Sequence, residues 1–585
     1  MISKLKKIVK KTIKYNVKIP KMLWERTAAK HRTHKARCEK KEQKLREFRE
    51  ALKKDETLKN KCDYVHFYDT LPVDKRIIVG EMQHGQSIGG NVFYMMKAMS
   101  HNADYESFRL VIFAVKKKLE EFRNFLNLQG MDDVELVTVG SAEYYRLLAS
   151  AGYLINDTSF TPNWVKKEGQ TYINTWHGTP FKAMGKNSKN DRYDIGNIQK
   201  NLIETDYLLY PNEYTAEHML TDYMVTDIAP GQVVLAGYPR NAVFFDEASR
   251  EEVRAKFGLK HKRVYAYMPT YRGSPHAKGV TKGDAYLVAY LEELDRALGE
   301  DECLYVNLHT YAKMRFDVEQ MFCHIRKFPE ETETYEFLNA CDVLFTDYSS
   351  VFYDYANSGK KVVLFPYDKE EYLKDRGTYV PMEEFPFPQV YNTTDLLAEL
   401  RSEKQYDDTE FLKKYCSYDN IDAAIRLCDF TVLRKENGLT LQPVPQNGKE
   451  NVIIYADSLG EDTFWKRFDE WQKKTDMTKK NYYLAFLRSS VKKNLDYLQE
   501  LPPEIRTFDM IPGMNLSEKD KKMYETFSCN LMSGERFGKR MQKRYEMEWL
   551  RRFGHASFEE AVLPEKAGRE ARLEWGGFPG KKTIL

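Results

Sequence analysis

Short runs of apolar residues alternate with longer amphipathic stretches through most of the chain after residue 75. Short β-branched runs separated by helix-length segments are typical of parallel strands joined by helical crossovers. A first series of such runs lies at 76–80, 108–115, 134–139, 152–157 and 171–176, and a second at 207–211, 232–239, 264–270, 303–309, 341–347 and 360–367. We therefore expect an α/β fold with two consecutive doubly wound units.

A third alternating segment follows the polar stretch 435–451. Its apolar runs lie at 452–459, 481–488 and 505–511, and the tail after residue 562 has little periodicity. This pattern indicates an incomplete domain or a small α/β appendage. The predicted division of the chain is a helical arm over 1–60, a first domain over 61–242, a second over 243–434 and an accessory segment over 435–585.

The amino-terminal arm is strongly basic. Residues 1–60 hold 21 Lys+Arg against 7 Asp+Glu, an excess of 14 within a net charge of +4, so the rest of the chain carries −10. Residues 1–21 contain eight lysines and no acidic residue, beside a helical stripe formed by Leu5, Ile8, Val9 and Ile13. Such a helix is typical of a segment that lies on an anionic membrane surface. The alternative is a basic helix docked on the acidic body of the protein itself.

The composition limits the classes of protein to which this chain can belong. With 585 residues, 42% hydrophobic and 30% charged, the chain is expected to fold into several globular domains. No apolar run approaches the roughly 20 residues of a membrane-spanning helix, and the amino terminus lacks a signal-peptide core. The eight cysteines form no CxxC pair, so neither a zinc site nor a disulfide framework is indicated. We expect a cytoplasmic protein, peripheral on the inner face of the membrane, with no required cofactor and no metal-ligating residues.

One candidate for chemistry follows the last strand of the first series. Ligands of open parallel sheets bind beyond the carboxyl ends of strands, so residues just after an apolar run are informative. Residues 176–180 read Trp-His-Gly-Thr-Pro, and Lys182 follows closely. A histidine near neutral pKa in this position is suited to removing a proton from a hydroxyl nucleophile. We therefore interpret His177 as a general base.

Further polar residues follow other predicted strands, namely Arg240, Thr270, Arg272, His309, Asp347, Ser349 and Ser350. Ser349 or Ser350 is expected to cap a helix whose first N–H groups and positive dipole end form an anion site. Arg240 and Arg272 are expected to hold phosphate oxygens through paired hydrogen bonds. Together these residues predict a phosphate-binding region.

The glycine-rich turn 81–91 follows the first predicted strand. It is not a GxGxxG fingerprint and lacks a P-loop lysine, so it is weak evidence for a dinucleotide. The other interpretation is an acceptor pocket in the first domain, which would involve His84, Gly85, Gly89, Gly90 and Lys182. The sequence contains no HExxH motif and no Cys–His zinc spacing, so metal-dependent hydrolysis is not indicated.

Five motifs in this order resemble the CDP-glycerol glycerophosphotransferase family of teichoic acid synthesis. They are WHGTPFKAMG at 176–185, GYPRN at 237–241, MPTYRG at 268–273, NLH at 307–309 and the stretch from TDYSS to KDRG at 346–377. The resemblance covers roughly residues 75–430. It implies a GT-B arrangement of two Rossmann-like domains, with the acceptor on the first and CDP-glycerol on the second.

The resemblance also implies a reaction and roles for residues. Glycerol phosphate would pass from CDP-glycerol to a hydroxyl of a membrane-linked acceptor, a lipid-linked glycan or polyol phosphate, with release of CMP. His177 would deprotonate this hydroxyl, and His309 would stabilise the pyrophosphate as CMP leaves. The positions expected to contact the donor phosphates are Arg272, Ser349, Ser350 and Arg376.

Alternatives remain open within and outside this class of enzyme. A GT-B glycosyltransferase that uses a nucleotide sugar, or a CDP-ribitol-dependent transferase, would carry the same sequence features. A nucleic-acid-binding protein acting through the basic arm is less well supported, because the arm lacks interleaved aromatic residues and the body is acidic. We therefore expect no nucleic acid partner.

Overall fold

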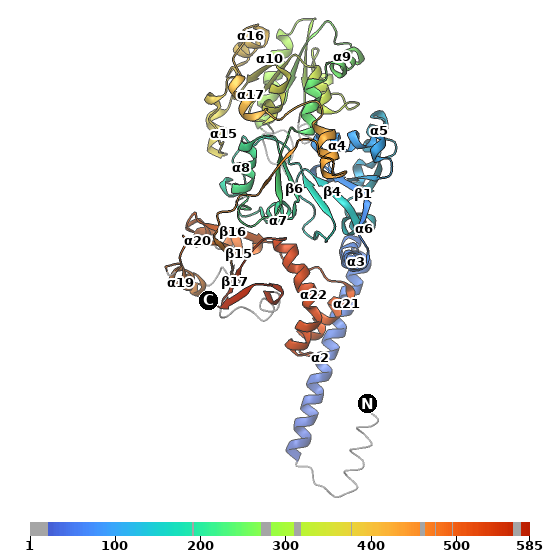
Figure 1. The fold of residues 1–585 in the computed structure, drawn as a ribbon, viewed down its shortest axis with the longest axis vertical. Coiled ribbons are helices and arrows are strands. Elements are labelled where there is room, and N and C mark those ends of the chain that lie inside the picture. The colour runs from blue at the N-terminus through green and yellow to red at the C-terminus, as the bar shows by residue number, and fades with distance from the viewer. Residues whose placement is uncertain are drawn as a thin grey trace.

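A computed structural model of the chain describes residues 21–189, 192–270, 282–308, 317–375, 377–456, 462–473, 475–493, 495–564 and 575–584. Three β-sheets follow one another along the long axis, each flanked by helices (Figure 1). The second sheet lies at one end, the first sheet follows, and the third sheet comes next, with α21 and α22 between it and the long helix α2, which extends to the other end. The chain is thus a mixed α/β protein built on parallel sheets.

The first sheet has the strand order β13-β7-β6-β5-β4-β1-β2-β3. Its parallel strands are β1 (Asp74–Glu81), β2 (Arg109–Ala114), β3 (Glu135–Thr138), β4 (Ala151–Asn156), β5 (Thr171–Asn174), β6 (Tyr207–Tyr210) and β7 (Gln232–Leu235). The strand order reverses between β1 and β4, which places a ligand crevice at their carboxyl ends. The associated helices are α4 (Gly90–Ser100), α5 (Leu119–Leu128), α6 (Ala142–Ser150), α7 (Gly196–Glu204) and α8 (Glu213–Asp222).

The second sheet is entirely parallel, with the order β10-β9-β8-β11-β12. Its strands are β8 (Arg263–Tyr267), β9 (Glu302–Val306), β10 (Ile325–Lys327), β11 (Val343–Thr346) and β12 (Lys361–Leu364). The switch point lies between β8 and β11. The helices are α9 (Glu247–Lys256), α10 (Lys282–Ala297), α12 (Val318–Met321), α13 (Thr334–Ala340), α14 (Val351–Tyr355), α15 (Lys369–Asp375), α16 (Thr393–Arg401) and α17 (Thr409–Tyr415).

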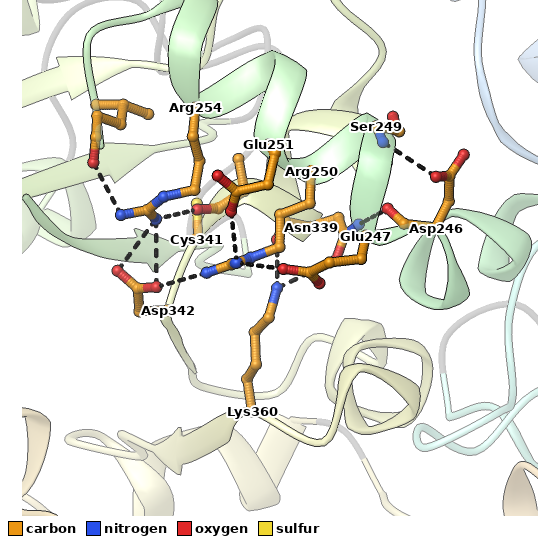
Figure 2. A network of polar contacts seen from close by, with 12 residues as sticks. Asp246, Glu247, Ser249, Arg250, Glu251, Arg254, Asn339, Cys341, Asp342 and Lys360 are labelled. Atoms are coloured by element: carbon orange, nitrogen blue, oxygen red, sulfur yellow. Dashed lines mark hydrogen bonds and ion pairs between the residues drawn. The ribbon is translucent and has the colours of Figure 1, made fainter. Parts of the chain in front are cut away.

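Helix α9, the first helix of the second domain, is held by a network of ion pairs (Figure 2). Arg254 Nη1 donates to both carboxylate oxygens of Asp342 at 3.2 Å, and Arg250 Nη2 donates to Asp342 Oδ1 at 3.2 Å. Asp342 also accepts the N–H of Val264 at 2.9 Å. Because Val264 lies in β8 and Asp342 precedes β11, the network fixes α9 to the amino ends of both strands.

The chain returns to the first domain after completing the second. Helix α18 (Ala423–Thr431) packs on α4, and β13 (Thr440–Pro443) pairs antiparallel with β7. Residues 440–443 fall in the segment predicted to be accessory, yet they form an edge strand of the first sheet. Periodicity in four residues is too short to indicate this pairing.

The described residues of the third segment form a parallel sheet of their own. The order is β16-β15-β14-β17-β18, and the strands are β14 (Glu450–Ala456), β15 (Lys480–Leu487), β16 (Ile505–Met510), β17 (Glu560–Leu563) and β18 (Lys581–Ile584). The helices are α19 (Asp462–Gln472), α20 (Leu495–Gln499), α21 (Glu518–Ser528) and α22 (Gly534–Phe553). A shared apolar cluster joins this domain to the first, including Ile203, Leu208, Ile453, Tyr483 and Trp549.

The basic arm continues as helix α2 (Lys21–Lys54), followed by α3 (Glu56–Thr70). The end of α2 contacts α21, where Lys44 Nζ donates to Glu525 at 2.8 Å and Arg49 Nε donates to Glu518 at 2.8 Å. The stripe predicted at residues 5–13 lies outside the described residues. Within the part of the chain that the structure describes, no helix is both long and apolar enough to cross a bilayer.

Candidate active site

The carboxyl ends of the first and second sheets face each other across Gly178. Its φ of +151° is a conformation that favours glycine. A Cβ at this position would lie 3.3 Å from Ser350 Oγ of the second domain and 3.4 Å from Arg240 Nη2. The glycine therefore lets the loop after β5 approach α14 closely, and it places His177 at the junction of the two domains.

His177 is half-buried and held in one tautomer. Its Nδ1 lies 2.8 Å from the backbone oxygen of Asp157, which can only accept, so Nδ1 carries the proton and Nε2 is left as an acceptor. Trp176 stacks on the imidazole with ring centroids 4.2 Å apart, and its own φ of +46° is left-handed. Burial is the main cause that lowers the pKa of His177 from 6.5 to about 4, and the nearby charges of Arg240 and His84 contribute in the same direction. The imidazole is therefore neutral near pH 7 and able to accept a proton.

Arg240 is buried and already paired. Its Nη2 donates to Asp354 Oδ2 at 2.7 Å, and its Nη1 donates to the backbone oxygen of His177 at 3.0 Å. Asp354 also accepts from Tyr335 Oη at 2.7 Å and from Asn241 Nδ2 at 3.2 Å. The geometry favours Arg240 as a residue that positions the His177 loop, whereas its predicted contact with donor phosphate stays a prediction.

The switch point of the second sheet brings Thr270 and Asp347 together. Asp347 is buried directly after β11, and its Oδ1 accepts the N–H of Thr270 at 2.8 Å and that of Tyr348 at 2.5 Å. Lys182 from the first domain lies close by, with Nζ 3.5 Å from Thr270 Oγ1. These contacts place three predicted site residues at the crevice where doubly wound sheets bind ligands.

The predicted serine cap does not form. Ser350 occupies the N-cap position of α14, but its side chain makes no capping hydrogen bond, because its φ of −68° and ψ of −2° are helical instead of extended. Both Ser349 and Ser350 are half-buried at the start of this five-residue helix. The Ser350 hydroxyl instead faces Gly178. Contact of either serine with a donor phosphate stays a prediction.

The glycine-rich turn lies at the switch point of the first sheet, where Asp157 Oδ1 accepts the N–H of Gln83 at 2.9 Å. His84 is exposed, with a left-handed φ of +56°. Gly85 is needed for packing, because a Cβ there would lie 2.8 Å from Val139. His84 is therefore an exposed side chain of this turn, and its charge acts on His177.

The amino end of α4 is occupied by a carboxylate from the second domain. Glu333 Oε1 accepts the N–H of Gly90 at 3.2 Å, and Glu333 Oε2 accepts from Tyr94 Oη at 2.7 Å. A Cβ at Gly89 would lie 2.8 Å from Glu333 Oε1. Burial raises the pKa of Glu333. This interaction with Glu333 favours a role for Gly89 and Gly90 in joining the first and second domains. The predicted contact of these glycines with an acceptor stays a prediction.

Three predicted site residues cannot be placed, because Arg272, His309 and Arg376 lie outside the described residues. The neighbour of Arg376 is nevertheless tied to the first domain, since Gly377 O accepts the N–H of Ala183 at 2.9 Å. Lys182 also forms a β-bridge with Thr378. The KDRG motif is therefore attached to the loop that follows His177.

Sequence reasoning missed the buried carboxylates Asp354, Asp419 and Glu333. Asp419 accepts from Asn241 and Asn357, and burial raises its pKa to about 7. An acidic residue inside the apolar run VFYDYA was the available signal for Asp354. Among the described residues, no group of three or more His, Cys, Asp and Glu side chains is arranged to hold a metal ion.

A family comparison decides the class of this protein. The profile described as CDP-glycerol:poly(glycerophosphate) glycerophosphotransferase matches residues 64–433, more than half of the chain. The chain belongs to this family. It is an enzyme of the CDP-glycerol glycerophosphotransferase type, as the sequence motifs predicted.

Several characterised relatives in this family are similar to the chain. The teichoic acid poly(glycerol phosphate) polymerase of Bacillus spizizenii is 25% identical over 379 residues, 61% of this chain and 92% of that protein. The same polymerase from Staphylococcus epidermidis is 31% identical over 310 residues, 49% of this chain and 42% of that protein. The teichoic acid glycerol-phosphate transferase of Staphylococcus aureus is 26% identical over 383 residues, 61% of this chain and 92% of that protein.

A solved structure shares the fold of about two thirds of the chain. The wall teichoic acid polymerase TagF, soaked with CDPG, superimposes with a TM-score of 0.53 at 26% identity and covers 67% of this chain and 98% of that chain. The glycerophosphotransferase match ends at residue 433, before β13 and the third sheet. The third domain is therefore an addition to the matched part.

Proposed function

We propose that this enzyme transfers glycerol phosphate from CDP-glycerol to a hydroxyl of a membrane-linked teichoic-acid-type or capsular acceptor. The acceptor oxygen forms a bond to the terminal phosphorus of the donor, the bond from that phosphorus to the bridging oxygen breaks, and CMP leaves. The hydroxyl proton passes to His177 Nε2. The observation that carries the proposal is the fixed, neutral tautomer of His177 beside the crevice of the second sheet.

The remaining parts of the site suit phosphoryl transfer, which depends on positioning and on charge stabilisation. Lys182 brings a cation to the crevice beside Thr270 and Asp347. Ser349 and Ser350 offer hydroxyls at the entry to α14. His309, Arg272 and Arg376 are proposed from the family resemblance to contact the donor phosphates.

Turnover assays with CDP-glycerol, CDP-ribitol and UDP-sugars in parallel test the proposal. We expect CMP release with CDP-glycerol to depend on an acceptor and to exceed that with the other donors. Ribitol-phosphate relatives match less of the chain, with 33–48% covered, and they motivate the second donor. Preferred turnover of CDP-ribitol or of a UDP-sugar would overturn the donor assignment.

The pH dependence of catalysis should report the state of His177. The base must be unprotonated, and burial lowers the pKa of His177 to about 4. The kcat/KM for transfer should therefore fall as pH decreases through about 4 and stay level above this range until a second group titrates. A pH–rate profile measures this. An acidic limb centred near 6.5 would contradict the buried, neutral imidazole.

We also propose that residues 1–21 bind the anionic surface of the membrane that carries the acceptor. Eight lysines should give binding to anionic vesicles that weakens with salt, and the apolar stripe should leave a salt-resistant remainder. Deleting residues 1–21 should abolish cosedimentation with such vesicles and preserve turnover of a soluble acceptor. Neutral vesicles are the control, and a deletion that loses soluble activity would show that this segment is structural.

A further inference from the structure

A basic cavity of about 280 Å³ lies where the third domain meets the first. Most of its lining comes from the amino-terminal parts of β15 and β16 and from the segment before β14, all after residue 446. The first domain contributes Lys186, Arg192, Tyr193 and Met224. Figure 1 shows β15, β16 and α20 beside this end of the first domain. The cavity is thus built mainly from residues beyond the family match.

Cations dominate the charged lining. Glu504 is its acidic member, and the basic members are Lys186, Arg192, Lys449, Lys480 and Arg506. Two of the five are oriented by carboxylates: Lys480 Nζ lies 3.0 Å from Glu560, and Arg506 Nη2 donates to Asp227 at 2.6 Å. A phosphate placed here would therefore meet cations that are held in position.

Among the residues that the structure describes, the other three cations have no carboxylate partner. Within the described ranges, no carboxylate lies within ion-pair distance of Lys186, Arg192 or Lys449. Lys449 Nζ donates to the backbone oxygen of Met477 at 2.8 Å, and Arg192 is exposed above the ring of Tyr193. These charges are available to an anionic ligand.

One wall of the cavity is apolar. Leu498, Leu501 and Pro503 line it, and Tyr193 Oη is fixed by donating to the backbone oxygen of Leu498 at 2.8 Å. A lining that combines cations with C–H surface matches a phosphate ester of a polyol, in which charged phosphates alternate with carbon backbone. Inorganic phosphate alone would leave the apolar wall unused.

A row of cations connects the cavity to the catalytic crevice along one segment of chain. Lys182 lies beside Thr270, Lys189 Nζ is 3.5 Å from the backbone oxygen of Leu373 in α15, and Lys186 and Arg192 line the cavity. These basic residues are spaced three or four positions apart in the sequence, on a segment that contacts the crevice at Lys182 and lines the cavity at Lys186 and Arg192.

We propose that this cavity is a subsite for the phosphodiester backbone of the polyol-phosphate chain that serves as acceptor or product. The proposal rests on the glycerol phosphate transfer proposed above and adds the place where the chain is held outside the crevice. The subsite raises the affinity for long acceptors and takes no part in the chemical step. A nucleotide monophosphate shares the phosphate ester chemistry, so the experiment includes it.

The test compares two double variants of the full chain. Lys186→Glu/Arg192→Glu reverses two charges of the cavity. Lys413→Glu/Lys539→Glu is the matched control, because both lysines are about three-quarters exposed and lie outside the cavity, with side-chain exposures of 76%. Binding of a synthetic glycerol phosphate oligomer, of glycerol 3-phosphate and of CMP is measured by calorimetry for each protein.

We expect the cavity variant to weaken oligomer binding about tenfold and the control to leave it unchanged. The KM for a long acceptor should rise with kcat retained, and turnover of a short acceptor should stay within about twofold of the unaltered enzyme. The proposal would be overturned if both variants weakened oligomer binding equally, or if the cavity variant left oligomer binding unchanged. It would also be overturned if the cavity variant lost only the binding of CMP. If the Lys186→Glu/Arg192→Glu variant fails to fold, the milder Lys186→Ala/Arg192→Ala variant replaces it. A thermal melting curve checks that this second variant is folded.

The direct binding measurement separates this proposal from the proposed function. If the unaltered enzyme fails to turn over CDP-glycerol, the glycerol phosphate transfer fails as a function. The effect of the cavity variant on oligomer binding shows whether the cavity is a subsite, whether or not the enzyme turns over CDP-glycerol.

Discussion

Replacing His177 with alanine is expected to lower the rate of transfer about 10²–10⁴-fold and to leave the affinity for CDP-glycerol within a few-fold. The imidazole donates from Nδ1 to Asp157 O and keeps Nε2 as an acceptor, so its loss removes the proposed proton acceptor and none of the residues proposed to bind the donor. Single-turnover kinetics and donor binding by calorimetry measure the two quantities.

His101→Ala is the matched control for this variant. His101 follows α4 and is exposed, with Nε2 3.2 Å from the backbone oxygen of Gly130. Its replacement should leave transfer unchanged. A His177→Ala enzyme that loses donor affinity as strongly as it loses rate would contradict the role of His177 as a base.

Replacing Asp354 with alanine should destabilise the joined first and second domains by about 3–5 kcal/mol. The Arg240–Asp354 pair is nearly inaccessible, with side-chain exposures of 7% and 3%, and truncation would leave a buried guanidinium without its carboxylate. The hydroxyl of Tyr335 and the amide of Asn241 would also lose their acceptor. Denaturant unfolding followed by intrinsic fluorescence measures the effect.

Two further variants test whether the loss of stability comes from the unpaired buried charge. Glu331→Ala removes an exposed carboxylate of the second domain and should change stability little. Arg240→Met combined with Asp354→Leu should recover part of the lost stability, because no buried charge is left unpaired. If Asp354→Ala had the same free energy of unfolding as the unaltered enzyme, the Arg240–Asp354 pair would be hydrated in solution.

Most strands of the first two sheets could be predicted, because buried parallel strands are continuous apolar runs. Strands β10, β13, β17 and β18 were not predicted: β10 has three residues, and β18 reads Lys-Lys-Thr-Ile with mostly exposed side chains. Such strands form because a neighbouring edge offers unpaired backbone groups, and this neighbour is distant in the sequence.

The residues of the candidate site also fall into those that the sequence could predict and those that it could not. His177 and Asp347 follow apolar runs, so the sequence locates them at strand ends. Asp354 and Glu333 act on residues that are 114 and 243 positions away, and nothing local in the chain indicates those partners. The predicted serine cap failed because Ser350 already has helical dihedral angles, which local residue preference does not determine.

The position of β13 has a consequence for biosynthesis. During translation β7 emerges long before residues 440–443, which pair with it and form the outer edge of the first sheet. At the usual rates of synthesis this delay is about 10–40 s, in which the ribosome produces the whole second domain. The edge of β7 stays unpaired in the nascent polypeptide and is a site where chaperones or other nascent chains can bind. Maturation of the amino-terminal half of the enzyme is therefore coupled to completion of the half that follows.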